Sequence, residues 1–216
     1  MKYYIILILS YFLTGCMSVA FYKDLSQSFF KELNGQASIP ITNYIKSLPY
    51  ASLILSRDES RQALLILSDE IDGRLLWVDS VGGTLLESSG KIVKSYGFEN
   101  DLEYLSYPNI SEIREKLLHA DEILTSHLFK LSNPVTHYLQ IELSYKILGS
   151  EIYTRKIDDK SFEVQIIEES FMVPLINWEG KNLYWIDQLG QTWKTRQILS
   201  PNSGYVTTEI LKIYQK

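Results

Sequence analysis

Apolar and polar residues alternate along much of the chain from Leu48 onward, the pattern of β-strands with one buried face. In the first half this pattern predicts five short strands: Ser52–Ser56, Gln62–Leu67, Arg74–Asp79, Thr84–Ser88 and Lys91–Tyr96. Turn-forming pairs such as Asp72-Gly73 and Gly82-Gly83 separate them, and glycine supplies the positive φ that tight turns need. Short strands at this spacing predict an antiparallel meander.

The second half contains the clearest alternation, which runs from His137 to Ile147. Further strands are predicted at Ile152–Ile157, Phe162–Ile167, Phe171–Ile176, Asn182–Asp187, Thr192–Leu199 and Tyr205–Tyr214. A short helix is predicted between Asn109 and Ala120, because Asn109 can cap it and Glu112 follows three residues later. The predicted fold class is therefore all-β with a few short helices, its antiparallel sheets packed as a sandwich or as half-barrels.

The residues before the strands have a different period. Phe21, Leu25, Phe29 and Leu33 recur every four residues, and Asn34-Gly35 is a suitable helix end. We expect an amphipathic helix here. One interpretation is that it caps the fold, and the other is that it docks on a membrane surface or a partner. The mixed charge of its polar face favours the first.

The start of the chain has the form of a bacterial lipoprotein signal. Lys2 precedes a short apolar stretch, which ends in Leu13-Thr14-Gly15-Cys16. The apolar stretch is about half of the roughly 20 residues that a membrane span needs. We therefore predict cleavage before Cys16 and attachment of a thioether-linked lipid and an acyl chain, such as palmitate, at this residue.

The predicted organisation is a signal peptide at residues 1–15 and a β-rich domain at residues 16–216. The helix near residue 110 could divide that domain into two halves, about 39–108 and 121–216. Cys16 is the only cysteine, so an exported form would have no internal disulfide and hydrophobic packing would have to stabilise it.

Composition and motifs exclude several classes of function. The formal net charge is −5 and there is no basic run, which argues against binding nucleic acid or anionic lipid. His119, His127 and His137 do not have metal-ligand spacing, and neither a nucleophile elbow nor a phosphate-binding loop is present. We therefore expect no metal, no cofactor and no enzymatic activity.

Several blocks, taken in order, resemble the YjbF/GfcB family of group 4 capsule polysaccharide lipoproteins. They are Leu48–Ser52, Ala63–Leu67, Leu76–Ser80, Gly90–Gly97 and Trp185–Pro201. The family more often has arginine at the position of Lys91 and serine at that of Thr195. A lysine cannot form the two parallel hydrogen bonds of a guanidinium, so an arginine-specific role at this position is in doubt.

The resemblance implies a β-rich lipoprotein anchored to the periplasmic face of the outer membrane. It would assist production or export of an exopolysaccharide or capsule without catalysis, and its partner would be an outer-membrane β-barrel or a periplasmic export component. Met17, where aspartate would commonly signal inner-membrane retention, agrees with this location. The alternative is a carrier or chaperone for lipid or outer-membrane proteins, which would need a large apolar cavity. A glycan-acting enzyme ranks third.

The last block contains the candidate contact residues for a glycan or a partner protein: Asp187, Trp193, Lys194, Arg196 and Gln197. Strand alternation predicts that Lys194 and Arg196 share one face, with Gln197 on the other. Two structural alternatives remain open. The charges could form a salt-bridged sheet face, and Trp193 could be a core residue rather than a platform for sugar rings.

Overall fold

The fold was analysed in a computed structural model that describes residues 45–57, 61–98, 100–107, 109–132 and 138–214. The predicted signal peptide, the lipidation site Cys16 and the helix predicted around residues 21–33 lie outside these ranges. None of the helices in the described part of the chain has the length and apolar character of a membrane span.

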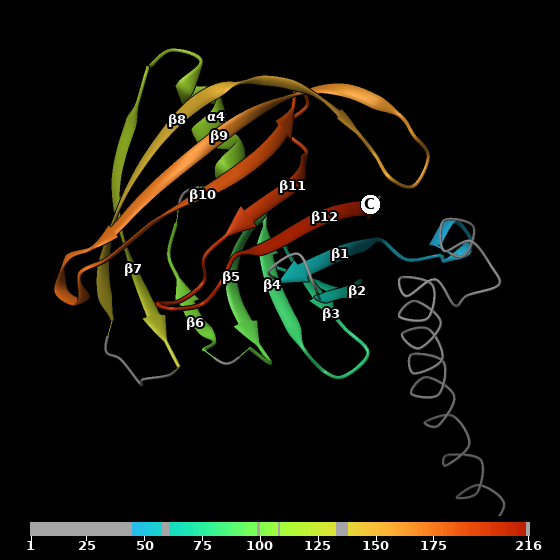
Figure 1. Ribbon diagram of the computed structural model, residues 1–216, viewed down its shortest axis with the longest axis horizontal. Coiled ribbons are helices and arrows are strands. Elements are labelled where there is room, and N and C mark those ends of the chain that lie inside the picture. The colour runs from blue at the N-terminus through green and yellow to red at the C-terminus, as the bar shows by residue number, and fades with distance from the viewer. Residues whose placement is uncertain (1–44, 58–60, 99, 108, 133–137, 215–216) are drawn as a thin grey trace, which may run out of the picture.

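In the described part of the chain, twelve antiparallel strands form one sheet in the order β5-β4-β3-β2-β1-β12-β11-β10-β9-β8-β7-β6 (Figure 1). The strands are β1 Ser52–Arg57, β2 Arg61–Ile71, β3 Arg74–Val78, β4 Thr84–Ser88, β5 Lys91–Tyr96, β6 Leu102–Leu105, β7 Ile123–Leu131, β8 Leu139–Thr154, β9 Ser161–Val173, β10 Trp178–Asp187, β11 Thr192–Gln197 and β12 Val206–Lys212. β1 lies between β2 and β12, so both suggested halves of the chain contribute to the same sheet.

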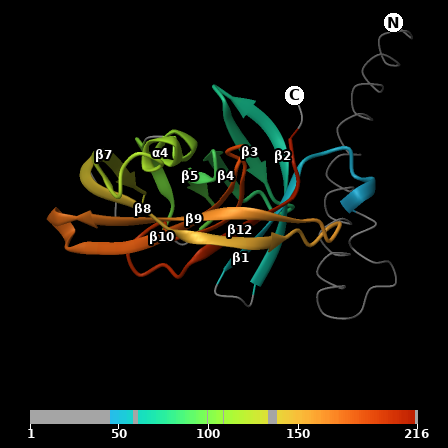
Figure 2. The same cartoon turned by 90° about the horizontal axis from the view of Figure 1, so that it is seen from above.

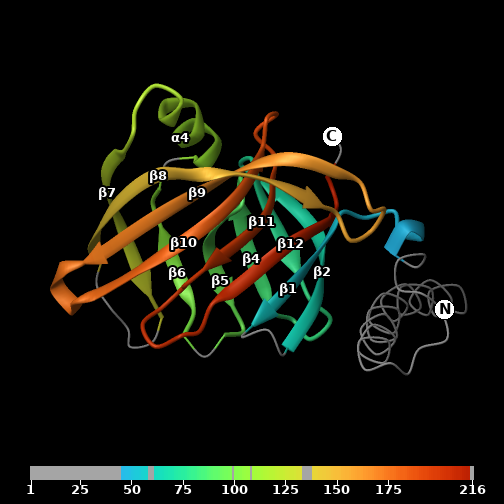
Figure 3. The ribbon, with the colours of Figure 1, turned by 45° about the horizontal axis from the view of Figure 1, so that its top comes forward.

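The sheet curls until its two edge strands, β5 and β6, face each other (Figure 3). Side-chain hydrogen bonds link these edges: the Ser95 hydroxyl donates to Asp101 over 2.9 Å and accepts the backbone N–H of Leu102 over 2.9 Å. Seen from above, β8, β9, β10, β12 and β1 form one side, while β3, β4 and β5 lie with the helix α4 on the other (Figure 2). The predicted all-β class is confirmed, with the facing layers built from one nearly closed sheet.

The predicted helix is confirmed as α4 Ile110–Leu117. The Asn109 side chain accepts the backbone N–H of Ser111 over 2.8 Å, which satisfies one of the free donors at the helix start. Ile110 and Ile113 are fully buried against β7 and β8. A second short helix, η1 Pro174–Ile176, follows β9.

Apolar side chains pack on both faces of the curled sheet. The inner face carries two clusters, one with α4 beneath β7 to β10 and one beneath β1 to β5. On the outer face, the far end of the long β8–β9 hairpin bends back over β11 and β12. There Tyr153, Val164, Trp185 and Trp193 form what we call the outer cluster.

Candidate functional site

The outer face of β11 carries two of the candidate residues, Lys194 and Arg196. Lys194 pairs with Trp185 of β10, and Arg196 pairs with Leu183. Arg196 is exposed and Lys194 is half-buried. The structure thus places the two cations on one face, as alternation predicts.

Trp193 also points to this face because of an irregularity in the strand. The register of β10 against β11 shifts so that Trp185 pairs with Lys194 and Ile186 pairs with Thr192, which leaves Trp193 as the extra residue of a bulge. Its ring lies 4.8 Å from that of Phe162, centroid to centroid, and only 7% of the residue is exposed. Trp193 is therefore a packed residue of the outer cluster rather than an open platform for a sugar ring.

Asp187 organises the turn between β10 and β11. One carboxylate oxygen accepts the backbone N–H groups of Leu189 and Gln191, each over 2.9 Å. The other accepts the indole N–H of Trp193 over 2.8 Å. Asp187 thereby holds Trp193, and the start of β11, in place.

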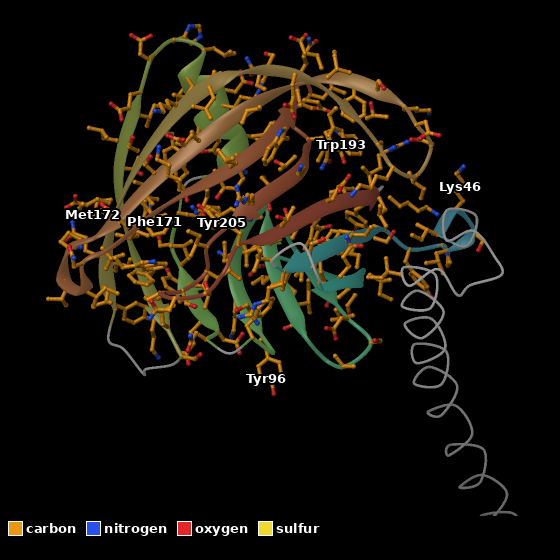
Figure 4. The ribbon with its side chains drawn as sticks, viewed as in Figure 1. Lys46, Tyr96, Phe171, Met172, Trp193 and Tyr205 are labelled. Carbon is orange, nitrogen blue, oxygen red and sulfur yellow. The ribbon has the colours of Figure 1, made fainter. Side chains whose placement is uncertain are left out.

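Three cations lie over aromatic rings on this side of the molecule, and we call them the cationic strip. The Arg155 guanidinium lies 5.3 Å from the Trp193 ring centroid, the Lys194 ammonium 4.7 Å from Trp185 and the Arg196 guanidinium 3.8 Å from Tyr205. Trp193 and Tyr205 mark the two ends of β11 (Figure 4). A cation held over a ring keeps a defined direction, and its remaining N–H donors suit carboxylate or phosphate groups.

Gln197 lies on the opposite face and has a structural role. Its amide donates to the Gly90 carbonyl over 2.8 Å, and its oxygen accepts the Ile92 N–H over 3.1 Å. It therefore ties β11 to β5 across the interior. The five candidate residues are close in sequence, but the sheet separates Gln197 from the cationic strip.

An ion pair between Lys91 of β5 and Glu169 of β9 crosses the interior. Lys91 is 2% exposed and Glu169 is 1% exposed, and the ammonium donates to the carboxylate. Asn182 donates to the other oxygen of Glu169 over 2.6 Å. Burial lowers the pKa of Lys91, and the negative charge of Glu169 opposes that shift. The pair joins strands 78 residues apart, so no local sequence pattern points to it.

A partly open pocket of about 270 Å³ lies beside Glu87 on the inner face and reaches Trp193. Burial raises the pKa of the Glu87 carboxyl, which accepts hydrogen bonds from the Gly90 N–H and, over 2.9 Å, from the Trp77 indole. Thr192 and Thr195 line it together with apolar residues such as Leu53, Leu85 and Ile92. Within the described ranges, no three His, Cys, Asp or Glu side chains gather as a metal ion would require.

These features define an all-β protein built on one curled sheet with a cationic outer strip. The crystal structure of the hypothetical lipoprotein YmcC from Escherichia coli K12 has a similar fold, with a TM-score of 0.66 and 17% sequence identity, covering 87% of this chain and 95% of YmcC.

The family follows from the sequence comparison. A family model described as group 4 capsule polysaccharide lipoprotein gfcB, YjbF matches residues 22–211, and the chain belongs to this family. The uncharacterised lipoprotein YjbF of Escherichia coli K12 is 25% identical over 197 residues, which span 88% of this chain and 89% of that protein. The family indicated by the resemblance is thus confirmed.

Proposed function

We propose that this protein is a non-enzymatic lipoprotein that assists production and export of an exopolysaccharide or group 4 capsule at the periplasmic face of the outer membrane. Membership of a capsule polysaccharide lipoprotein family supports the pathway. The sequence around Cys16 supports attachment of a lipid anchor, and Met17 after it supports location at the outer membrane.

The cationic strip is the observation that carries a binding role. Lys194 and Arg196 lie over the rings of Trp185 and Tyr205, and neither forms an ion pair with a carboxylate in the part of the chain that the structure describes. Their charges are therefore available to an acidic contact, such as a uronic acid on the polysaccharide or an acidic loop of an outer-membrane β-barrel or periplasmic export component.

The inner cavity bears on the carrier alternative. Pockets for small ligands usually measure about 300–1,000 Å³ and are mostly apolar. The inner cavity measures about 270 Å³ and is lined in part by Glu87 and threonines. Larger hollows, of about 940 and 1090 Å³, lie over β7 to β10 and beside Arg155 and Leu211. The pocket on the inner face is small for a lipid cargo, and we therefore favour contact through the outer surface.

Replacing Lys194 and Arg196 together with alanine should reduce secreted polysaccharide or recovery of the export partner several-fold. The fold should persist, because the exposed Arg196 and the half-buried Lys194 each contribute about 1 kcal/mol or less. Secreted polysaccharide is measured in cells that carry only the variant. The melting temperature of the purified variant is measured beside that of the wild type.

The matched control replaces Lys94 and Lys116, which are exposed on β5 and α4, with alanine. It removes the same net charge elsewhere and should secrete normally. Normal secretion by the Lys194/Arg196 variant, with wild-type melting, would show that the strip is not the contact surface.

Replacing Cys16 with serine should abolish lipid attachment and leave uncleaved, mislocalised precursor, because the hydroxyl cannot form the thioether. Labelling with radioactive palmitate and membrane fractionation measure both effects. The matched variant Met17→Asp should still be lipidated but should remain in the inner membrane. A Cys16→Ser protein that fractionates normally with the outer membrane would refute the predicted anchor.

A further inference from the structure

The second half of β8 is a sheet edge. β7 pairs with β8 only as far as Ile123 opposite Tyr145, whereas β8 continues to Thr154 alongside β9. Within the described ranges, residues 146–154 therefore have a strand neighbour on one side only. This part of the hairpin extends past β7 (Figure 1).

The segment Gly149–Thr154, which we call the β8 edge, follows a bulge between Ile147 and Gly149 and then pairs regularly with β9. Its side chains are almost all exposed, and Ile152 is 68% exposed. Proteins usually blunt such an edge with lysine, proline or a covering loop. An exposed isoleucine at the middle of an edge instead favours pairing with another strand.

The β8 edge is also held in a fixed shape. The Tyr153 hydroxyl donates to Glu209 of β12 over 2.8 Å, and the Trp185 indole donates to Glu151 over 2.6 Å. Beyond the edge, Arg155 forms an ion pair with Asp158 in the connecting turn. A strand fixed on its own sheet loses little entropy when a second strand adds to it.

We infer that the β8 edge pairs antiparallel with the same edge of a second copy of this chain, about a twofold axis at Ile152. In this register Ile152 faces Ile152, Glu151 faces Tyr153 and Ser150 faces Thr154. Glu151 is the only charged residue of the segment, so no like charges oppose each other. The edge is thus complementary to itself, as a twofold interface requires.

This self-pairing goes beyond the proposed function and does not depend on it. Strand addition at one edge buries a small area, so the pairing should be weak in solution. Attachment of both copies to one membrane would raise their effective concentration and favour the pair.

The test measures the protein mass of the full-length lipoprotein by light scattering, in detergent and at high protein concentration, because the pairing is weak. We expect a dimer for the wild type, and monomers for Ile152→Lys and for Ile152→Glu, because each places like charges opposite each other on the axis. Mixing the two variants should restore a dimer, since lysine then faces glutamate. The matched control is Leu124→Lys on β7, where the replaced leucine is 74% exposed, and it should remain dimeric.

A second measurement fixes the register. Ile152→Cys should form an intermolecular disulfide on mild oxidation, whereas Thr154→Cys should not. The two Thr154 positions would lie four residues apart, about 13 Å along the strands. A wild type that is monomeric at high concentration, a dimer that Ile152→Lys leaves intact, or equal cross-linking of both cysteine variants would overturn the inference, and the edge would then serve a different protein.

Discussion

Replacing Lys91 with methionine is expected to lower the free energy of unfolding by about 3–5 kcal/mol. Methionine fills much of the same space, but Glu169 would keep its charge at a fully buried position without its cation, with only neutral groups such as Asn182, Tyr145 and Tyr184 near it. The variant must either bury an unpaired carboxylate or protonate it, and both are costly. Urea unfolding of wild type and variant measures the difference.

The matched control is the double variant Lys91→Met with Glu169→Gln. It removes both charges and keeps an oxygen that can accept from Asn182, so it should recover most of the lost stability. The coupling between the two positions in this double-mutant cycle should be about 2 kcal/mol or more. If Lys91→Met alone costs less than about 1 kcal/mol, the ion pair does not stabilise the interior as its burial implies.

The sequence predicted the strands that alternate cleanly and missed those that do not. β7 was not predicted, because its inner face carries Thr125 and His127 while its outer face carries Leu124 and Leu128. Apolar and polar residues therefore occur on both faces and the two-residue period is obscured. The tertiary fold, rather than local hydrophobicity, determines which face of β7 is buried.

Strand ends were predicted less well than strand positions. The strand predicted at Phe171–Ile176 ends at Val173, because Pro174 has no N–H to donate and begins η1. The strands predicted on either side of Gly149 are one strand, β8, in which the glycine follows a bulge instead of forming a turn. A glycine at a turn between two strands and a glycine at a bulge within one strand look the same in the local sequence.

The candidate site was predictable only in part. Alternation placed Lys194 and Arg196 on one face, but the ring beneath Arg196 comes from Tyr205 and the cation above Trp193 comes from Arg155. Such contacts depend on how β8, β11 and the loop before β12 meet in the folded sheet. The bulge that turns Trp193 outward has no signal of its own in the sequence.

Trp193→Ala is expected to destabilise the protein by about 3–5 kcal/mol, which is the usual cost of removing a buried tryptophan. The ring packs on Tyr153 and Phe162 in the outer cluster, and its indole N–H donates to Asp187. The change would open a cavity beneath the bent end of the β8–β9 hairpin and leave one oxygen of the Asp187 carboxylate without its donor.

Trp193→Phe separates these two contributions, because it keeps an aromatic ring and removes only the N–H. It should lose about 1–2 kcal/mol, the cost of one hydrogen bond to a charged group together with the smaller ring. Thermal melts of both variants and of the wild type measure the two losses of stability, and Trp193→Ala should show the larger one. Were Trp193→Ala to melt within a few degrees of the wild type, the outer cluster would not hold the hairpin, and the cation positions above it would have to be fixed by other contacts.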